Sequence, residues 1–294
     1  MQIVTQSAGP FSDDCAKRLA HALGANDSTR RSSSCVVYTL GRTPLARDAL
    51  HAVCGEHDVD SAIVQTLRPL SDFGLLVFDM DSTLINIECI DELADLVGKK
   101  QEVAALTEQA MRCGNVDYDT SLRMRTRLLA GLSVARFDDV YAQRLQITPG
   151  AAALVKTAKL AGLKTAIVSG GFDYFTGRVR AELGVDEDYS NRLEVVAGKL
   201  TGELLGTLIN ADVKAQRVQA LCRDSGISTG EAIVVGDGAN DLKMMALAGL
   251  SVGYCAKPVV RAAVDVNIER LGLDSLLTAL DAQAAPGISG VDPR

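Results

Sequence analysis

The chain has 294 residues, of which 47% are hydrophobic, enough to build one large core or two cores of unequal size. Its formal net charge of -7 and its pI near 5.1 argue against a nucleic-acid-binding protein, which usually presents a basic surface. No basic and apolar leader opens the chain, and no apolar run reaches the about 18 residues of a membrane span. We therefore expect no membrane association and a cytoplasmic location.

Cysteine and histidine usage does not indicate a metal site. The seven cysteines are scattered without a CxxC pair, and the three histidines, His21, His51 and His57, all precede residue 58. This pattern argues against a zinc site and against a disulfide framework. We expect mostly buried thiols in a reducing compartment, and histidines at the surface or at helix ends.

The first 72 residues are expected to form a separate small unit with the element order βαββαβ. Apolar runs at 2–6, 35–40 and 60–67 alternate with helical patterns at 11–24 and 45–57. The Ser/Arg-rich stretch 28–34 is either the second strand or an ordered loop. This order resembles a ferredoxin-like fold of the ACT type, which binds amino acids at subunit interfaces. Because no ligand motif stands out, a packing or dimerisation module, and with it a homodimer, is an equal expectation.

From Leu75 onward, short apolar runs alternate with helical patterns, which is typical of parallel strands joined by crossover helices. The expected strands lie at 75–79, 165–170, 232–237 and 250–254, and the expected helices at 151–160, 174–183 and 213–222. The sequence therefore predicts a doubly wound α/β core over residues 73–285. The carboxyl ends of its parallel strands should line the ligand crevice.

Two stretches do not follow this alternation. Residues 86–147 carry helical repeats such as Ile87, Ile90 and Leu93 on one face, which predicts a helical cap inserted after the first strand. Residues 188–208 have short β-prone runs around Gly198 and Gly202, which predicts a hairpin. The last residues, 286–294, are expected to form a flexible tail.

The strongest chemical signal is DMDST at 79–83, where Asp79 and Asp81 follow an apolar strand. A carboxylate at a strand end can bind a divalent cation and attack phosphorus, while a second one can protonate the leaving oxygen and later deprotonate water. The structural alternative is a helix N-cap or an Asx-turn, because Asp and Ser favour such turns.

Three further signals follow the later strands. GDGAND at 236–241 places Asp237 and Asp241 in a glycine-rich loop, and oxygen ligands of this kind suit Mg²⁺ better than Zn²⁺. SGG at 169–171 offers a hydroxyl and amides to phosphate oxygens. Lys214 precedes a helical pattern and can neutralise phosphoryl charge. Taken one by one, these signals are also explained by turns and by a surface lysine.

The motifs DxDxT, Ser, Lys and GDGxND, in this order, resemble the haloacid dehalogenase superfamily over residues 75–280. Within it, the runs 78–94, 169–172, 191–202 and 235–258 closely resemble phosphoserine phosphatases. The resemblance implies that Asp79 is the nucleophile and a Mg²⁺ ligand. It implies that Asp81 is the general acid and base, with its carbonyl on the metal, and that Asp237 is the third protein ligand.

The same resemblance assigns the residues around the substrate. Those expected to hold the phosphoryl group are Ser169, Gly170 and Lys214. Those expected to bind the serine ammonium and carboxylate are Glu88 and Arg125. The supporting residues are Asp241 for the metal shell, Asn240 for the substrate and Lys214, and Met111 and Tyr118 for closure of the cap. The position of Tyr118 more often carries phenylalanine, which puts the packing of the cap in question.

Simpler explanations exist for the two residues expected to bind the serine moiety. Glu88 and Asp91 also suit a helix N-terminus, and the run SLRMRTR holds three arginines, at least one of which must face water. We prefer Arg125 over Arg123 because of the family spacing.

The sequence thus predicts a Mg²⁺-dependent enzyme that hydrolyses O-phosphoserine in serine biosynthesis. One alternative keeps the chemistry but uses another acceptor alcohol or another small phosphorylated amine. A second is an amino-acid sensor that acts through residues 1–72 and carries an inert phosphatase-like domain. The presence of Asp79, Asp81, Lys214 and Asp237 argues against the second alternative.

Overall fold

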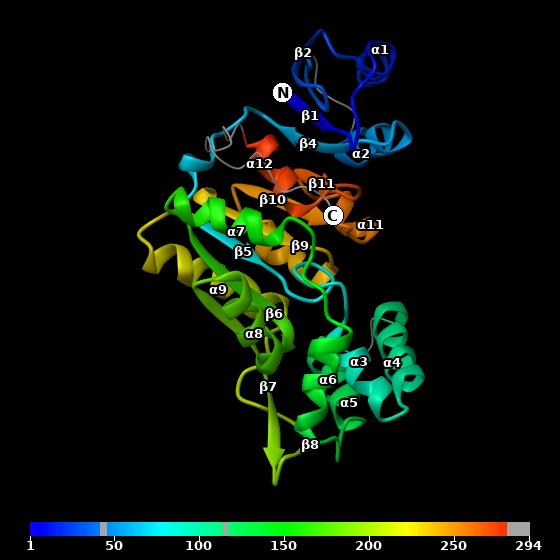
Figure 1. The fold of residues 1–294 in the computed structure, drawn as a ribbon, viewed down its shortest axis with the longest axis vertical. Helices are drawn as coiled ribbons and strands as arrows, with labels where there is room; N and C mark the ends of the chain where they lie inside the picture. Colours follow the sequence, from blue (N-terminus) through cyan, green and yellow to red (C-terminus); the bar gives the residue numbers. More distant parts are fainter. Residues whose placement is uncertain (42–45, 114–116, 281–294) are drawn as a thin grey trace.

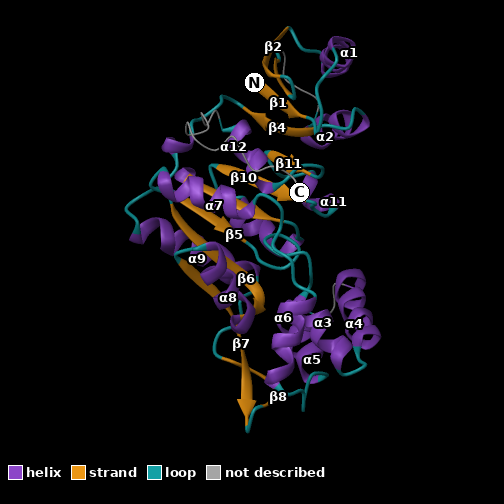
Figure 2. Ribbon diagram, viewed as in Figure 1, coloured by secondary structure: helices purple, strands orange, loops and turns teal. Residues whose placement is uncertain are grey.

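A computed structural model describes residues 1–41, 46–113 and 117–280, and the side chains of all of these except 109–113. Eleven strands of the described chain form one sheet (Figures 1 and 2). They are β1 (Gln2–Gln6), β2 (Asp27–Ser32), β3 (Cys35–Thr39), β4 (Asp60–Val64), β5 (Leu75–Phe78), β6 (Lys164–Phe172), β7 (Glu187–Val196), β8 (Lys199–Leu205), β9 (Ala232–Gly236), β10 (Leu250–Tyr254) and β11 (Val266–Ile268).

The strand order across the sheet is β2-β3-β1-β4-β11-β10-β9-β5-β6-β7-β8. The helices of the N-terminal part and of the cap are α1 (Asp13–Leu23), α2 (Arg47–Glu56), α3 (Cys89–Leu96), α4 (Lys100–Cys113), α5 (Tyr118–Arg127) and α6 (Phe137–Gln143). Those of the core are α7 (Ala151–Leu160), α8 (Asp173–Leu183), α9 (Ala211–Asp224), α10 (Leu242–Met245), α11 (Pro258–Arg261) and α12 (Leu276–Ala279).

The core is the predicted doubly wound sheet. Strands β11, β10, β9, β5, β6 and β7 pair in parallel along the sheet. Because successive side chains of a strand point to opposite faces, Leu76 and Phe78 pack in the cluster under α7 and α8, while Leu75 and Val77 pack in the cluster under α9. This burial on both faces explains why the strands are almost wholly apolar in sequence.

The predicted cap and hairpin are both present. Helices α3 to α6 form the cap between β5 and α7, and β7 and β8 pair antiparallel as a hairpin (Figure 1). Backbone hydrogen bonds join the two, from Gly131 to the Leu200 carbonyl at 2.8 Å and from Val134 to the Gly198 carbonyl at 3.0 Å. The cap therefore rests on the outer strand of the hairpin.

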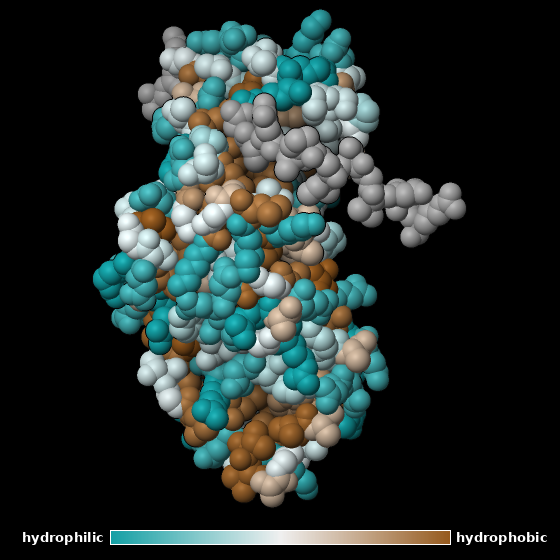
Figure 3. Space-filling view, turned by 60° about the vertical axis from the view of Figure 1, so that its left-hand side comes forward, coloured by the Kyte–Doolittle hydropathy of each residue, from teal (hydrophilic) through white to brown (hydrophobic). Residues whose placement is uncertain are grey.

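The tip of this hairpin carries exposed apolar side chains. Val195 is 45% exposed and Val196 is 61% exposed, while Leu205, at the far end of β8 opposite Arg192, is 39% exposed. Figure 3 shows hydrophobic residues gathered at this end of the molecule. An apolar surface of this kind is available to a partner.

The N-terminal elements follow the expected order β1-α1-β2-β3-α2-β4, and the Ser/Arg-rich stretch forms the strand β2. These elements are continuous with the core sheet, because β4 pairs antiparallel with β11 of the core. The Ile63 amide also donates to the Asp265 carbonyl at 2.7 Å. The first strands thus extend the core sheet.

Polar side chains support this junction between β4 and the core. The His51 ring lies 2.7 Å from the Ser61 hydroxyl and 3.2 Å from the Val264 carbonyl oxygen, and it is buried. Its burial lowers the pKa of His51, although the hydrogen bond to Val264 opposes this. The expectation that all three histidines lie at the surface or at helix ends is therefore wrong for His51.

The cysteines follow the expectation only in part. Cys35, Cys54, Cys89 and Cys222 are buried, but Cys255 is exposed. Burial raises the pKa of the Cys54 thiol to about 12, so this group stays protonated. None of the helices in the described part of the chain combines the length and the apolar character that crossing a membrane requires.

The buried Asp60 carboxylate lies at the junction between β4 and the core, and its contribution to stability can be tested. It accepts hydrogen bonds from the amides of Glu269, Arg270 and Leu271, at 3.0 to 3.2 Å. We expect Asp60→Asn to lower the free energy of unfolding in urea by about 2 to 4 kcal/mol, because an amide cannot accept all of these bonds. The matched control is Asp58→Asn, which removes an exposed carboxylate that also faces Arg270. Equal losses of unfolding free energy in the two variants would contradict a stabilising role of Asp60 at this junction.

Candidate active site

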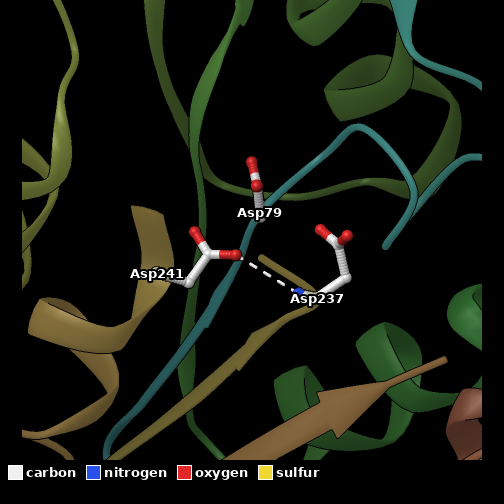
Figure 4. A group of neighbouring side chains, drawn as sticks. All are labelled: Asp79, Asp237 and Asp241. Atoms are coloured by element: carbon white, nitrogen blue, oxygen red, sulfur yellow. Dashed lines mark hydrogen bonds between the residues drawn. The ribbon is translucent and has the colours of Figure 1, made fainter. Parts of the chain in front are cut away.

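Three carboxylates meet at the carboxyl end of the core sheet. Asp79 follows β5, and Asp237 and Asp241 follow the neighbouring strand β9. One oxygen of each lies within 4.8 Å of the others, and Figure 4 shows the three side chains gathered around one point. A Cβ at Gly236 would clash with the Asp241 carboxylate, so the glycine permits this close approach.

A fully buried lysine neutralises part of this acidic cluster. Lys214, in the first turn of α9, places its Nζ 2.9 Å from Asp79 and 2.7 Å from Asp241. Burial alone would lower the pKa of Lys214, but the charges of Asp241 and Asp79 outweigh it and raise the pKa. The ammonium therefore stays charged.

Asp241 organises the loop that carries Asp237. Its Oδ2 accepts a hydrogen bond from the amide of Asp237 (Figure 4) and another from the amide of Gly238, both at 3.2 Å. Its Oδ1 accepts a hydrogen bond from Lys214. Burial and the charge of Asp79 raise the pKa of Asp241 to about 7, against the opposing effect of Lys214. Because both oxygens are engaged, the side chain has little freedom to move.

Asp81 lies just past β5, near these carboxylates, but its hydrogen bonds differ from those of Asp241. Its Oδ2 accepts from the Cys89 amide at 3.3 Å, and its Oδ1 is buried without a hydrogen-bond partner among the described residues. A Cβ at Gly171 would lie 3.2 Å from Asp81 Oδ2 and 3.3 Å from Ser169 Oγ, so both groups border the same space beside this glycine. Burial, then the charge of Glu88, raises the pKa of Asp81 well above its usual value. A carboxyl of this kind keeps a proton that it can donate.

The SGG segment differs from its prediction. It does not follow the strand but lies inside β6, where pairing with β7 is interrupted between Val168 and Phe172. The Ser169 hydroxyl, buried in this irregularity, accepts a hydrogen bond from the Gly171 amide at 3.0 Å. The interruption frees backbone groups that a regular ladder would use.

Asn191 holds this irregular segment in place, and it was not predicted as a site residue, although it opens the run 191–202 that the resemblance covers. Its buried side chain donates to the Gly170 carbonyl at 2.8 Å and accepts from the Ile209 amide at 2.9 Å. It therefore ties the SGG segment to the loop that leads into α9 and Lys214. An asparagine inside a β-prone run was the available signal, because strands seldom contain one.

Of the two residues predicted to bind the serine moiety, Glu88 lies near Asp81 and Asp237, and Arg125 lies on α5 of the cap, where its Nε donates to the Ser121 carbonyl at 3.4 Å. Glu88 precedes α3, but its carboxylate accepts from the Ser82 hydroxyl at 2.9 Å and does not cap the helix. Burial raises the pKa of Glu88, although the bond from Ser82 opposes this. Arg125 is half-buried and close enough to lower the pKa of Asp91 against the raising effect of burial. Its neighbour Arg127 instead pairs with Glu203 at the surface.

The remaining predicted site residues are Asn240, Tyr118 and Met111. The Asn240 side chain lies over Gly238, whereas Lys214 is held by the two aspartates. Tyr118 reaches Gly170 from the cap. The Met111 side chain lies outside the described residues, as does the predicted tail 286–294.

Lys257 was not predicted as a site residue, although it belongs to the run CAKP that the resemblance covers. Its Nζ lies 3.2 Å from Asp237 Oδ2, and its side chain is 47% exposed. Burial would lower the pKa of Lys257, but Asp237 and Glu88 outweigh it and raise the pKa. The lysine therefore neutralises part of the carboxylate charge of this cluster.

The donor set fits a divalent cation. Three buried carboxylates converge within 4.8 Å, and two ammonium groups pair with them. Carboxylate oxygens without histidine or thiolate are the ligands of hard cations.

Comparison with known proteins agrees with this geometry. A family model described as haloacid dehalogenase-like hydrolase matches residues 76–246. The phosphoserine phosphatase of Polaromonas sp. is 55% identical over 212 residues, which cover 71% of this chain and 90% of that protein.

Two solved structures show the same relation. A haloacid dehalogenase family hydrolase from Salmonella enterica serovar Typhi has a TM-score of 0.84 at 30% identity, and the match covers 96% of this chain and 99% of that one. A substrate-bound phosphoserine phosphatase complex has a TM-score of 0.65 at 37% identity, covering 70% of this chain and 97% of that one. The chain therefore belongs to the haloacid dehalogenase-like hydrolases and, within them, to the family of the phosphoserine phosphatases.

Proposed function

We propose that this chain hydrolyses O-phosphoserine to serine and phosphate, in serine biosynthesis, through an aspartyl-phosphate on Asp79. The observation that carries the proposal is the arrangement of Asp79 beside Lys214, with Asp81, whose pKa burial raises, and the Ser169 hydroxyl both close to Gly171. It is supported by relatives named phosphoserine phosphatase, one of them solved with substrate and one as a phospho-aspartyl intermediate analogue.

In the first step, an Asp79 oxygen attacks phosphorus and the bond to the serine oxygen breaks. Asp81 gives its proton to that oxygen, so serine leaves as a neutral alcohol. In the second step, the Asp81 carboxylate takes a proton from water, whose oxygen attacks the phosphorus of the aspartyl-phosphate. Phosphate leaves and the Asp79 carboxylate is restored. Lys214, the Ser169 hydroxyl and the Gly170 amide hold the phosphoryl oxygens through both steps.

Mg²⁺ is the cofactor that we propose, with Asp79, the Asp81 carbonyl and Asp237 as its protein ligands and Asp241 orienting this set. When bound, it neutralises charge on the phosphoryl oxygens and on Asp79. The proposal rests on the acidic cluster and on its oxygen-only character.

Glu88 and Arg125 are proposed to bind the ammonium and the carboxylate of the substrate. A half-buried guanidinium offers a bidentate contact to a carboxylate, and a buried carboxylate suits an ammonium. Asn240 is proposed to organise the substrate beside Lys214.

The wider organisation of the chain is part of the proposal. We propose that residues 1–72 act as an ACT-like unit and that the phosphatase core begins at residue 73, with its cap at 86–147. A homodimer is supported by the exposed apolar side chains at the hairpin tip (Figure 3). A cytoplasmic location is supported by the free thiols among the described cysteines.

Removal of the metal is expected to abolish phosphate release from phosphoserine. Dialysis against EDTA should stop turnover, and added Mg²⁺ should restore it and raise the thermal unfolding midpoint, because the cation binds only the folded carboxylate cluster. Asp79→Asn is the control, with no turnover and a smaller rise in midpoint. Activity that survives thorough removal of divalent ions would rule out the metal assignment.

Asn191→Leu should lower kcat/KM for every phosphate substrate by about 10-fold to 100-fold, because Gly170 loses the group that positions it. Ser190→Ala is the matched control, since that neighbouring hydroxyl bonds to Thr176. Initial rates with phosphoserine and with an aryl phosphate measure the effect. A loss confined to phosphoserine would show that Asn191 does not act through the phosphoryl group.

Arg125→Ala is the test of the substrate. We expect it to cost about 2 to 5 kcal/mol in kcat/KM for phosphoserine, as for one partner of a buried charge pair, and much less for an aryl phosphate without a carboxylate. Lys214→Ala should impair both substrates alike, and Arg127→Ala should change neither. If the Arg125 variant lost kcat/KM equally on the two substrates, Arg125 would not bind the substrate carboxylate. The chain would then be a phosphatase that acts on a substrate other than phosphoserine.

A further inference from the structure

Tyr118 is the first residue of α5, and its hydroxyl lies against the SGG segment of the core. A Cβ built on Gly170 would clash with the Tyr118 hydroxyl oxygen, while the next atoms in its path are Tyr118 Cζ at 3.5 Å and the Ile209 carbonyl at 3.7 Å. The hydroxyl thus occupies the space directly over Gly170.

The neighbouring residue fixes this position. Asn210 donates to the Asp119 carboxylate at 3.0 and 3.3 Å, and Asn210 also caps α9 by accepting from the amides of Asp212 and Val213. The start of α5 is therefore attached to the start of α9, one turn before Lys214. This attachment keeps the Tyr118 hydroxyl near the groups proposed to hold phosphate.

The hydroxyl is available as a donor. Burial raises the pKa of Tyr118 to about 12, although the charge of Lys214 opposes this, so the phenol keeps its proton in the neutral range. The charges of Lys214, Arg125, Asp79 and Asp81 all act on this ring. A neutral donor at this place can meet an anionic oxygen.

We propose that the Tyr118 hydroxyl donates a hydrogen bond to the phosphoryl group when the cap is closed. This rests on the proposed function, because it adds a fourth contact to those of Ser169, Gly170 and Lys214. The resemblance in sequence places phenylalanine here more often, and phenylalanine lacks this donor. The contact would let the cap recognise the phosphoryl group itself as well as the serine moiety.

The first test compares Tyr118→Phe with the parent protein on phosphoserine and on an aryl phosphate without ammonium or carboxylate. Loss of a hydrogen bond to a charged group should lower kcat/KM for both substrates by about 10-fold to 100-fold. The inhibition constant of inorganic phosphate should rise as well. Tyr141→Phe is the matched control, because that hydroxyl, on α6 of the cap, donates to the exposed Glu182 carboxylate on α8 of the core.

A second test uses the contact with Gly170. In the parent protein, Gly170→Ala places a methyl group where the hydroxyl lies, but in the Y118F background the nearest side-chain atom is Cζ at 3.5 Å. We expect Gly170→Ala to cost less activity in the Y118F background than in the parent, which a double-mutant cycle measures. Additive losses would overturn the contact.

The outcomes separate this inference from the proposed function. Unchanged rates and unchanged phosphate inhibition in Tyr118→Phe would overturn the inference, and so would a loss confined to phosphoserine, because the hydroxyl would then meet the carboxylate beside Arg125. If the parent protein failed to hydrolyse phosphoserine, the proposed substrate would fall. The rates with the aryl phosphate and the inhibition by inorganic phosphate would still test the role of the Tyr118 hydroxyl.

Discussion

The buried ammonium of Lys214 between Asp79 and Asp241 is the interaction on which the rest of the structure depends. A charge with no exposed surface is costly unless its partners are close, and here they lie at 2.9 and 2.7 Å. Two separate segments must therefore reach the same point: the end of β5 and the loop after β9. Removing either carboxylate would leave a buried charge with one partner fewer.

The parallel sheet brings these segments together. Because β9, β5 and β6 are neighbours that run in one direction, their carboxyl ends lie on one edge, and each ends or bends at a functional residue. Helix α9 crosses back over this sheet and delivers Lys214 in its first turn, fixed by Asn210. The apolar faces of the strands supply the stability that offsets the cost of gathering like charges at the edge.

Much of this could be predicted from the sequence, because the signals were local. Strands β5, β9 and β10 are apolar on both faces and stop at turn residues, so their bounds differ from the prediction by at most one residue. Asp79 and Asp237 followed directly from those ends.

Features that depend on distant partners could not be predicted. The bulge around Ser169 exists because Asn191 and β7 meet it from another strand. His51 is buried because its acceptor, the Val264 carbonyl, lies 213 residues further along the chain. The pairing of β4 with β11 also joins segments from opposite ends of the chain, and β11 has only three residues with no distinctive pattern. Lys257 has no local sequence signal that separates it from other surface lysines, because only the fold brings it beside Asp237.

The pairing of β4 with β11 also changes which strands form the two solvent-facing edges of the sheet. The substrate-bound phosphatase matches only 70% of this chain, and the family model begins at residue 76, so a core without the first strands is a complete fold elsewhere. In this chain the outermost strand on that side is β2, whose residues DSTRRS are all exposed. On the other side, loop 131–134 covers part of β8. A polar strand at one edge and a covered strand at the other leave little unpaired apolar edge for a second molecule to extend, which protects the protein against aggregation through its sheet.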